Sequence, residues 1–374
     1  MTRAVTHPRT RDRSAREGLR ILIIGPAHSI ALEQWVDEML ARGHEILVLS
    51  PNEPRPALAD RVESTEAGFR PPLLGLLLRI IYVRRRVRSY RPDVVHGQSA
   101  IDYGLWAALS GRVPALVTCW GSDVFIAPRM KRKSRWKVRT ALRCATYVTG
   151  TSQALLDAAD RVAGKKLAGE IVFWGVDTDV FRPVDRSGRP NVTVLSVRGH
   201  ETLYNIDVIL RAFARLRDVR PHVRLVVAHQ GSLTPALKDL TRELGIADAV
   251  TFLGFVEQDA LPQVYAEADV YVSVPSSDAS AVSNLEAMAS GLPVVGSTLP
   301  STLEWIEDGV NGLVVPPGDE DALTDALVRL VDDEGLRLRL GTEARRMAEA
   351  RGSRASQMDR ASEIYRLLAE GRLP

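Results

Sequence analysis

Two carboxylates, Asp278 and Glu286, stand eight positions apart around the start of a helix-forming segment. The apolar run just before them, residues 270–274, predicts a buried strand, and residues 281–290 predict a helix. In a parallel sheet, ligands bind at the carboxyl ends of the strands. Both carboxylates are therefore expected near a ligand, where they can accept hydrogen bonds from the paired hydroxyl groups of a sugar.

The start of the predicted helix offers a second kind of contact. The first N–H groups of a helix have no partner within it, and together they form a site for anions. Here these groups belong to Ala281, Val282 and Ser283. A nucleotide sugar fits this layout, with its diphosphate on the amides and its hydroxyls on the carboxylates. The alternative is a helix whose Glu286 only faces solvent.

This stretch resembles the Glu-x7-Glu signature of retaining, family-4-type glycosyltransferases. Residues 285–295, LEAMASGLPVV, are an especially close match, whereas Asp278 stands where the family has its first Glu. The resemblance covers most of the chain and is most specific in the C-terminal half. It implies the α/β fold class called GT-B, in which two Rossmann-like parallel-sheet domains face each other across a cleft. It also implies a nucleotide-diphosphate sugar as donor, a UDP-sugar first of all, and no cofactor and no metal ion.

Length and composition agree with a globular protein of two domains. The chain has 374 residues, 45% of them hydrophobic, and its net charge of +3 is too small to indicate binding to nucleic acid. Its two cysteines, Cys119 and Cys144, have no metal-site spacing and fit a reducing cytosol. No apolar stretch reaches the roughly 18 residues that span a bilayer. These observations predict a cytoplasmic protein.

The order of the predicted elements divides the chain. Residues 1–18 are polar and Arg-rich, so we expect a disordered tail and no signal peptide. After this tail, strands and helices alternate in two successive regions of the chain. This pattern predicts one parallel sheet in residues 19–183 and another in residues 191–352. The resemblance implies that the first domain binds the acceptor and the second the nucleotide sugar. It further implies that a last helix, in residues 353–374, crosses back to the first domain.

In the second domain, Arg198 ends the first predicted strand, and its guanidinium suits two oxygens of a diphosphate. The family has a Lys about six positions later, where this chain has Tyr204. One cation of the expected pair is therefore missing, although the Tyr204 hydroxyl can donate a hydrogen bond. The resemblance assigns a catalytic role to Arg198 and to Asp278, and it assigns base binding to the backbone near Val256.

In the first domain, the resemblance points to residues at strand ends. The segment PDVVHGQS predicts a strand that ends at His96. The resemblance counts His96 among the catalytic residues, because the matching His of the family borders the donor sugar. Asp123 matches a family position after the next strand, but Trp120 replaces its usual His. We expect Asp123 and Trp120 on the acceptor side; for Trp120, packing in the core is the alternative. His28, in the first loop, is either a further acceptor-side residue or a loop residue without function.

Two basic segments stand out in the first domain. Residues 79–91 contain six Arg, residues 129–143 contain eight Lys or Arg, and neither segment contains an acid. The first is either a helix with a core stripe and a solvated Arg face or a helix lying on an anionic membrane surface. The second is either a solvated face or, together with the first, a surface for an acidic acceptor such as a lipid phosphate.

The resemblance implies a metal-independent, retaining sugar transfer from a nucleotide-diphosphate sugar to a glycan, a lipid-linked acceptor or a small molecule. Two alternatives use the same fold. One is a nucleotide-sugar epimerase, which releases a rearranged sugar without any acceptor. The other is a non-catalytic subunit that binds a nucleotide sugar, an alternative favoured by the missing Lys.

Overall fold

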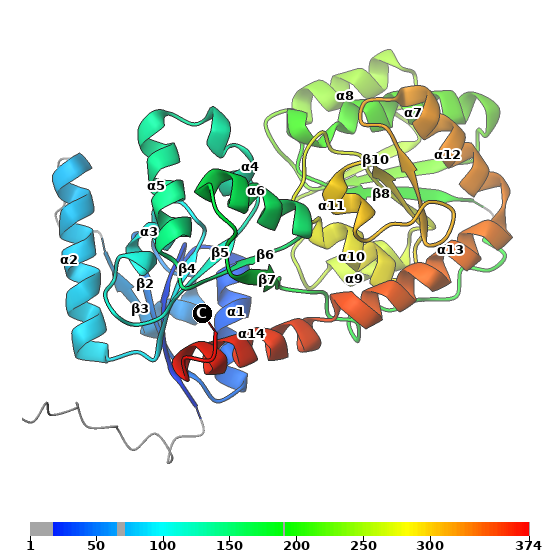
Figure 1. The fold of residues 1–374 in the computed structure, drawn as a ribbon. Helices are drawn as coiled ribbons and strands as arrows, with labels where there is room; N and C mark the ends of the chain where they lie inside the picture. Colours follow the sequence, from blue (N-terminus) through cyan, green and yellow to red (C-terminus); the bar gives the residue numbers. More distant parts are fainter. Residues whose placement is uncertain (1–17, 66–71, 190, 374) are drawn as a thin grey trace, which may run out of the picture.

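The computed structural model describes residues 18–65, 72–189 and 191–373 and shows two lobes, each built on its own sheet (Figure 1). Every strand pairing within the two sheets is parallel. The predicted α/β class with two parallel-sheet domains is therefore confirmed. Apart from Gly18, the tail predicted for residues 1–18 lies outside the described residues.

The first lobe has a seven-stranded sheet in the order β3-β2-β1-β4-β5-β6-β7. Its strands are β1 (Arg20–Ile24), β2 (Glu45–Ser50), β3 (Val62–Ser64), β4 (Val94–Gln98), β5 (Ala115–Cys119), β6 (Tyr147–Gly150) and β7 (Gly169–Ile171). Its helices are α1 (Ile30–Ala41), α2 (Pro72–Tyr90), α3 (Tyr103–Ala108), α4 (Ser122–Phe125), α5 (Arg132–Cys144) and α6 (Gln153–Ala163). The order reverses direction beside β1, so the loops that follow β1 and β4 lie next to each other at one edge of the sheet.

The second lobe has a six-stranded sheet in the order β10-β9-β8-β11-β12-β13. Its strands are β8 (Thr193–Val197), β9 (Arg224–Ala228), β10 (Val250–Gly254), β11 (Val270–Ser273), β12 (Val294–Ser297) and β13 (Gly312–Val315). Its helices are α7 (Ile206–Val219), α8 (Thr234–Glu243), α9 (Leu261–Ala266), α10 (Val282–Ala289), α11 (Pro300–Leu303), α12 (Glu320–Asp332) and α13 (Glu334–Met347). The switch point here lies between β8 and β11, which are neighbours in the sheet.

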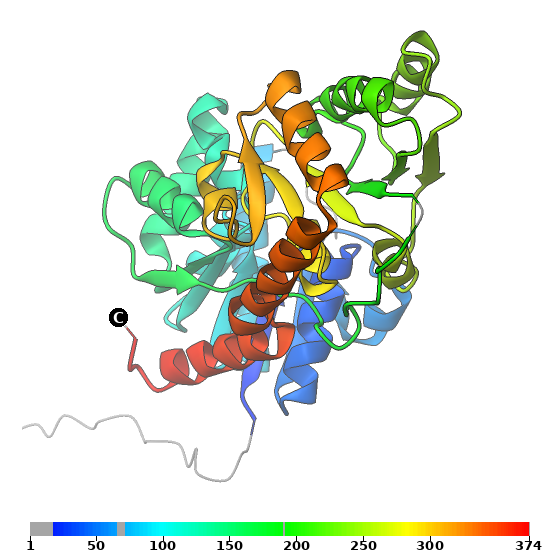
Figure 2. The same ribbon diagram turned by 90° about the vertical axis from the view of Figure 1, so that its right-hand side faces the viewer.

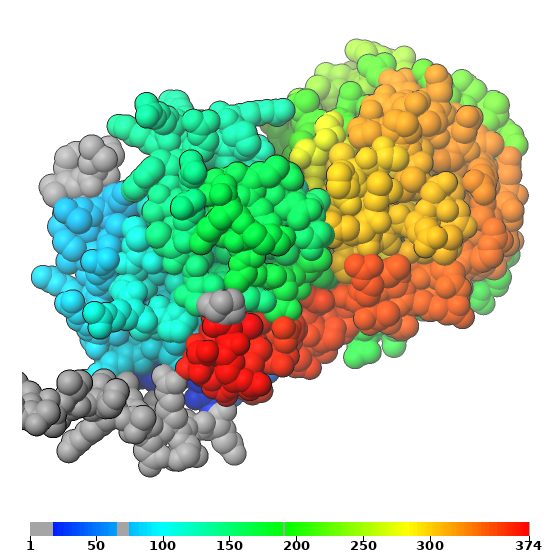
Figure 3. Space-filling view, in the orientation of Figure 1, coloured from blue at the N-terminus to red at the C-terminus, as the bar shows by residue number. Residues whose placement is uncertain are grey.

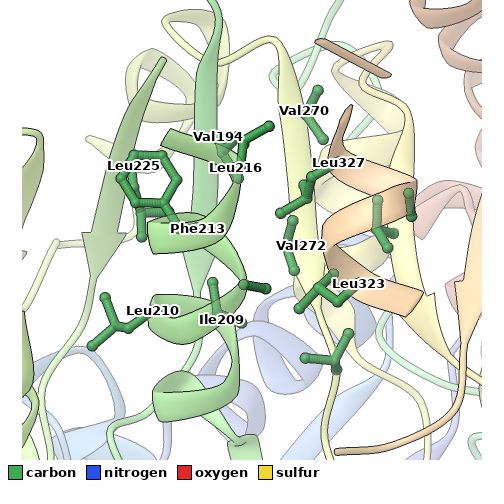
Figure 4. Packing of buried hydrophobic residues seen from close by; sticks show 14 of the residues in the cluster. Val194, Ile209, Leu210, Phe213, Leu216, Leu225, Val270, Val272, Leu323 and Leu327 are labelled. Carbon is green, nitrogen blue, oxygen red and sulfur yellow. The ribbon is translucent and has the colours of Figure 1, made fainter. Parts of the chain in front are cut away.

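The core of the second lobe shows why this sequence forms layers. Helices α7 and α12 turn their apolar stripes toward one face of the sheet, where Phe213 and Leu327 are fully buried against strand residues such as Val272 (Figure 4). The strands are apolar on both faces because helices cover both. This packing holds β8 and β11 rigidly, so the loops at their carboxyl ends have a fixed base.

The last helix joins the two lobes. Beyond α13 and a short π-helical turn, α14 (Arg354–Ala369) lies against the first lobe (Figures 1 and 2). Its apolar face, including Met358, Ile364 and Tyr365, is buried in the same cluster as Ile21 of β1 and Trp35 of α1. The chain therefore ends on the lobe in which its first strand lies.

Polar groups inside this junction are hydrogen-bonded. The Trp35 Nε1–H donates to the Tyr365 hydroxyl at 2.9 Å, and that hydroxyl lies 2.6 Å from Nδ1 of His96. His96 Nε2 lies 2.7 Å from the Thr118 hydroxyl of β5. Burial lowers the pKa of His96 to about 3, so the ring is neutral at physiological pH. The network joins α14 to the middle of the first sheet.

Helix α2 corresponds to the first basic segment. Val83 and Val87 are buried in the cluster that contains Trp106, so the helix packs on the sheet through a core stripe. Its outer face exposes Leu77 and Ile81, with 54% and 38% of their surface accessible. Three Arg side chains continue this exposed stripe toward the end of the helix: Arg84, Arg85 and Arg88. No helix in the described part of the chain is long and apolar enough to cross a bilayer.

We expect Tyr365→Phe to destabilise the protein while leaving the shape of the core unchanged. The substitution removes the hydroxyl that the Trp35 indole and the His96 ring share, and each lost partner of a buried polar group costs about 1–3 kcal/mol. Chemical denaturation should therefore show a loss of about 2 kcal/mol or more in the free energy of unfolding.

Tyr82→Phe serves as the control, because the Tyr82 hydroxyl makes only a long contact of 3.4 Å with Glu63. Its effect should stay within about 0.5 kcal/mol. Equal effects of the two substitutions would contradict the importance of the junction network.

Candidate functional site

A cavity of about 960 Å³ lies between the two lobes. The first lobe contributes α4, α6 and the loop at Trp120 that follows β5, and the second lobe contributes the loops that follow β8, β11 and β12. Loops at the carboxyl ends of strands in two parallel sheets therefore face each other, which is where α/β folds bind ligands. On the face drawn in Figure 3 the two lobes touch each other above α13 and α14.

Arg198 lies behind the second lobe's wall, where it pairs with Asp278, a residue that lines the cavity. It follows β8, only 9% of its surface is accessible, and its Nη2 lies 2.6 Å from Oδ2 of Asp278. Its Nη1 donates to the Ser283 hydroxyl at 3.2 Å, whereas its buried Nε has no partner among the described residues. Burial lowers the pKa of Arg198, but the adjacent Asp278 carboxylate outweighs this effect and raises it. The guanidinium therefore stays charged, and these two contacts use only two of its five N–H donors.

Tyr204 lies against the same guanidinium. The centre of its ring is 4.3 Å from Cζ of Arg198, a distance typical of a cation–π contact. Tyr204 also lines the cavity, together with Asp278. The residue that replaces the expected Lys therefore adds no charge; its ring stabilises the cation that is present.

Helix α10 begins beside this ion pair. Ala281 is its N-cap residue, and no side chain caps the helix. The amides of Val282 and Ser283 belong to the first turn and have no intrahelical acceptor. These residues lie behind the cavity wall formed by Asp278 and its neighbours, so the helix points its positive end toward the region of Arg198.

Glu286 lies inside α10 and is 5% accessible. Its carboxylate accepts hydrogen bonds from Gln258 Nε2 at 3.1 Å and from the Tyr265 hydroxyl at 2.9 Å. Burial raises its pKa, while these two hydrogen bonds oppose that rise. The solvated orientation considered as an alternative is therefore wrong. A carboxylate has about four acceptor positions, so capacity remains for ligand hydroxyls.

The predicted position of His96 is wrong. Strand β4 continues for two residues beyond it and ends at Gln98, so the His96 ring points into the sheet core and not toward the cavity. The change from apolar residues to a polar one at His96 suggested that the strand ends there. In the structure, buried Thr118 and Tyr365 hydrogen-bond to the His96 ring, so the strand can continue past this polar residue. We therefore withdraw His96 as a residue at the donor sugar.

Gln98 is the residue found at the end of this strand. Its Oε1 accepts a hydrogen bond of 3.0 Å from Nε1 of Trp120, and Trp120 lines the cavity. The Trp120 ring packs edge-on against Trp174, with 5.3 Å between ring centres. Trp174 in turn donates to the Ala31 carbonyl of α1 at 2.8 Å. Trp120 is therefore a fixed wall of the cavity, not a residue of the core.

Asp123 organises the loop that carries Trp120. Its buried carboxylate accepts from the backbone N–H groups of Ala100, Trp120 and Gly121 and from the Ser99 hydroxyl, at 2.6–3.1 Å. Burial raises its pKa, and these hydrogen bonds lower it. Because its oxygens are turned toward these donors, Asp123 holds the loop of Trp120 in place, and it does not line the cavity itself.

The two lobes also touch directly across the cavity. Gly121 has a φ of +119°, and a Cβ added there would lie 2.5 Å from the Cβ of Ala279. The Glu304 carboxylate of the second lobe accepts from the N–H groups of Gln153 and Ala154, at 2.8 and 2.9 Å. These two amides begin α6, so a residue of one lobe caps a helix of the other.

The two remaining candidates lie apart from this cluster. His28 is exposed in the loop before α1, and Val256 follows β10 and packs partly buried against the second lobe's core. Within the described residues, no group of three or more His, Cys, Asp or Glu side chains is arranged to hold a metal ion. Sequence patterns gave no signal for Gln258 and Tyr265, the partners of Glu286, because both belong to distant segments.

Comparison with protein families assigns both halves of the chain. Residues 178–347 match the model "Glycosyl transferases group 1", and residues 20–152 match the model "Glycosyl transferase 4-like". A D-inositol 3-phosphate glycosyltransferase of Stackebrandtia nassauensis is 39% identical over 188 residues, covering 46% of this chain and 42% of the relative. Two further relatives are matched over 34% and 47% of their own length, so the chain spans less than half of each.

Solved structures share the fold over nearly the whole chain. HepE of Anabaena, determined in complex with UDP, aligns with a TM-score of 0.79 at 19% identity and covers 92% of this chain and 99% of its own. A sucrose-phosphate synthase of Thermosynechococcus elongatus aligns with a TM-score of 0.80 at 20% identity, covering 94% and 100%. The two sheets, the crossing helix and both family matches agree, and the chain belongs to the group 1 glycosyltransferases of GT-B fold.

Proposed function

We propose that this protein transfers a sugar from a nucleotide-diphosphate sugar to an acceptor hydroxyl, with retention of anomeric configuration and without a metal ion. One observation carries the proposal. The buried Arg198 guanidinium and the uncapped start of α10 lie together directly behind Asp278, which lines a cavity between two parallel sheets. Donors held in place in this way can stabilise a leaving diphosphate.

The proposed donor is a UDP-sugar. Support comes from the structural neighbour HepE, which was solved with UDP bound. In this chain, the diphosphate would take hydrogen bonds from Arg198 and from the first amides of α10, and the nucleotide's hydroxyls would be accepted by Glu286. The backbone around Val256 remains our proposal for the contact to the base.

Catalysis in this proposal depends on position and charge. The acceptor attacks the sugar on the face from which the diphosphate leaves, through an oxocarbenium-like state, and this geometry retains the configuration. Arg198 and the start of α10 stabilise the charge that develops on the leaving group. Trp120 and its loop, held by Asp123, form the opposite wall, where we propose that the acceptor binds.

Product analysis distinguishes this activity from the two alternatives. Incubation with UDP-glucose and a panel of acceptors should give a glycoside only when an acceptor is present, and NMR should show the donor's anomeric configuration in the product. Addition of EDTA should leave the rate unchanged. An acceptor-independent change of the sugar would indicate an epimerase, and UDP binding without any product would indicate a binding subunit.

Removal of Arg198 should reduce turnover at saturating donor. Loss of a single preorganised donor costs about 10²–10³ in rate, and we expect Arg198→Ala at or beyond the upper end because no Lys stands at position 204. Arg198→Lys should recover only part of the loss, since an ammonium cannot make a bidentate contact.

The control for this experiment is Arg211→Ala, an exposed Arg of α7 paired with Glu320 at 3.7 Å. It should keep full turnover, and circular dichroism should show an intact fold for every variant. If Arg198→Ala retains more than about a tenth of the wild-type turnover, far above that range, another cation serves the diphosphate.

Glu286→Gln should weaken UDP binding without unfolding the protein. The substitution removes a charged acceptor, and hydrogen bonds to charged groups contribute about 1.5–3 kcal/mol, so isothermal titration should show a loss of about tenfold or more. Since burial raises the pKa of Glu286, wild-type affinity should also fall as the pH decreases through that raised pKa and the carboxylate takes up a proton. The variant should lack this component.

Glu267→Gln is the matched control, because Glu267 is an acid of the same lobe whose carboxylate only accepts from the exposed Gln263. It should bind UDP normally. Unchanged affinity of Glu286→Gln for UDP and for other nucleoside diphosphates would remove Glu286 from the donor site.

We also propose that α2 contacts an anionic membrane surface. Its exposed stripe carries apolar residues at one end, Leu77 and Ile81, and Arg residues at the other. Each Arg near such a surface contributes about 1 kcal/mol, so Arg85→Gln/Arg88→Gln should lower binding to anionic vesicles roughly thirtyfold in sedimentation assays. Wild-type binding should weaken as salt rises.

Arg329→Gln/Arg339→Gln removes two exposed charges from the second lobe and should leave vesicle binding unchanged. If the wild type bound neutral and anionic vesicles equally, or bound neither, the membrane contact would be excluded. Helix α2 would then be an ordinary helix with a solvated Arg face.

A further inference from the structure

A second hollow, of about 520 Å³, lies on the first lobe beside the cavity between the lobes. We call it the arginine groove, and its charged lining consists of Arg132, Arg135, Arg139 and Arg161. The first three come from α5 and stand at positions i, i+3 and i+7, which lie on one face of a helix. Arg161 comes from α6, so two helices direct their cations toward one hollow.

None of these four side chains forms a salt bridge with a described residue, and no acid belongs to the lining of the groove. Elsewhere in the structure, exposed Arg side chains commonly pair with acids, as Arg215 does with Glu320 at 2.9 Å. Four unpaired guanidinium groups around one hollow repel one another, and a bound anion with several oxygens would remove that repulsion. Phosphate is suited to this role, because a guanidinium can bind it with two N–H groups.

The groove is also apolar. Phe125 and Val162 belong to its lining, and Trp136 stands at its edge with 54% of its surface accessible. The exposed indole can contact an apolar part of a ligand, and the unpaired Arg side chains can bind a charged part of the same ligand. This combination favours an amphiphilic phosphate over a small hydrophilic one.

The arginine groove adjoins the cavity between the lobes. Three residues, Phe125, Pro128 and Arg161, line both spaces. A single molecule can therefore hold an anionic group at the Arg side chains and extend a hydroxyl into the cavity. The donor's diphosphate is expected on the opposite wall, at Arg198, so the two anionic groups do not compete for the same cation.

We propose that the arginine groove binds the phosphate group of a lipid-phosphate acceptor, whose hydroxyl reaches the cavity. This inference rests on the proposed sugar transfer for the role of the hydroxyl, but the phosphate site itself is a separate binding site. The proposed phosphate site gives the acceptor a chemical class, which cannot be inferred from the donor site.

A soluble, monomeric lipid phosphate tests this site without a membrane. Dihexanoyl phosphatidic acid should bind in isothermal titration, and Arg135→Gln/Arg139→Gln should weaken that binding by about tenfold or more, because hydrogen bonds between charged groups are lost. The matched control is Lys131→Gln/Lys133→Gln, which removes two exposed charges at the same end of α5, outside the groove. UDP affinity should be the same in all variants, and saturating UDP should leave lipid-phosphate binding intact.

Four results would overturn the proposal. Equal weakening by the two double variants would mean attraction by overall charge, and displacement of the lipid phosphate by UDP would mean that it occupies the donor site. If glycerol 3-phosphate bound as tightly as the lipid phosphate, the acyl chains would make no contribution to binding and the proposed lipid character of the ligand would be wrong. No binding of either phosphate, with UDP binding intact, would exclude the groove and leave the proposed function standing. Conversely, a chain that binds the lipid phosphate but not UDP would keep the groove and contradict the proposed function.

Discussion

A charge that must be held out of water organises the second lobe's side of the cavity. Burying a guanidinium costs several kcal/mol unless charge and hydrogen bonds compensate for it. The compensation for Arg198 comes from Asp278, from Ser283 and from the ring of Tyr204. Since these residues belong to three different segments of the second lobe, the one cation brings together the loop after β8, the loop after β11 and the start of α10. The cavity's shape on this side follows from that requirement.

The fold could be predicted from the sequence because its signals are local. Apolar runs separated by helix-forming segments predicted both parallel sheets, and the strand predicted in residues 270–274 corresponds to β11, Val270–Ser273. The segment around Arg198 could likewise be predicted in part, since Asp278, Ser283 and Glu286 share one strand–loop–helix unit. The periodicity of apolar residues does not identify the hydrogen-bonding partner of a buried polar group when that partner belongs to a distant segment.

The wrong prediction for His96 and the site residues that were missed have this same cause. His96 seemed to end its strand because a polar residue in a central strand is unfavourable without partners, and its partners lie 22 and 269 positions away. The same holds for Gln258 and Tyr265 at Glu286, and for the packing of Trp120 on Trp174. The convergence of α5 and α6 on one groove also depends on tertiary packing. A run of eight basic residues in the sequence does not reveal which of them face a common hollow.

The contact at Gly121 has a mechanical meaning. Its hydrogen-only side chain lets the backbone of the acceptor-side loop approach Ala279, and any Cβ at position 121 would collide with that methyl group. The close approach of the lobes at this point therefore depends on the absence of one carbon atom. A larger residue there would act as a spacer that holds the two lobes apart, and it would separate the Glu304 carboxylate from the start of α6. In this protein, glycine determines how far the two lobes can close.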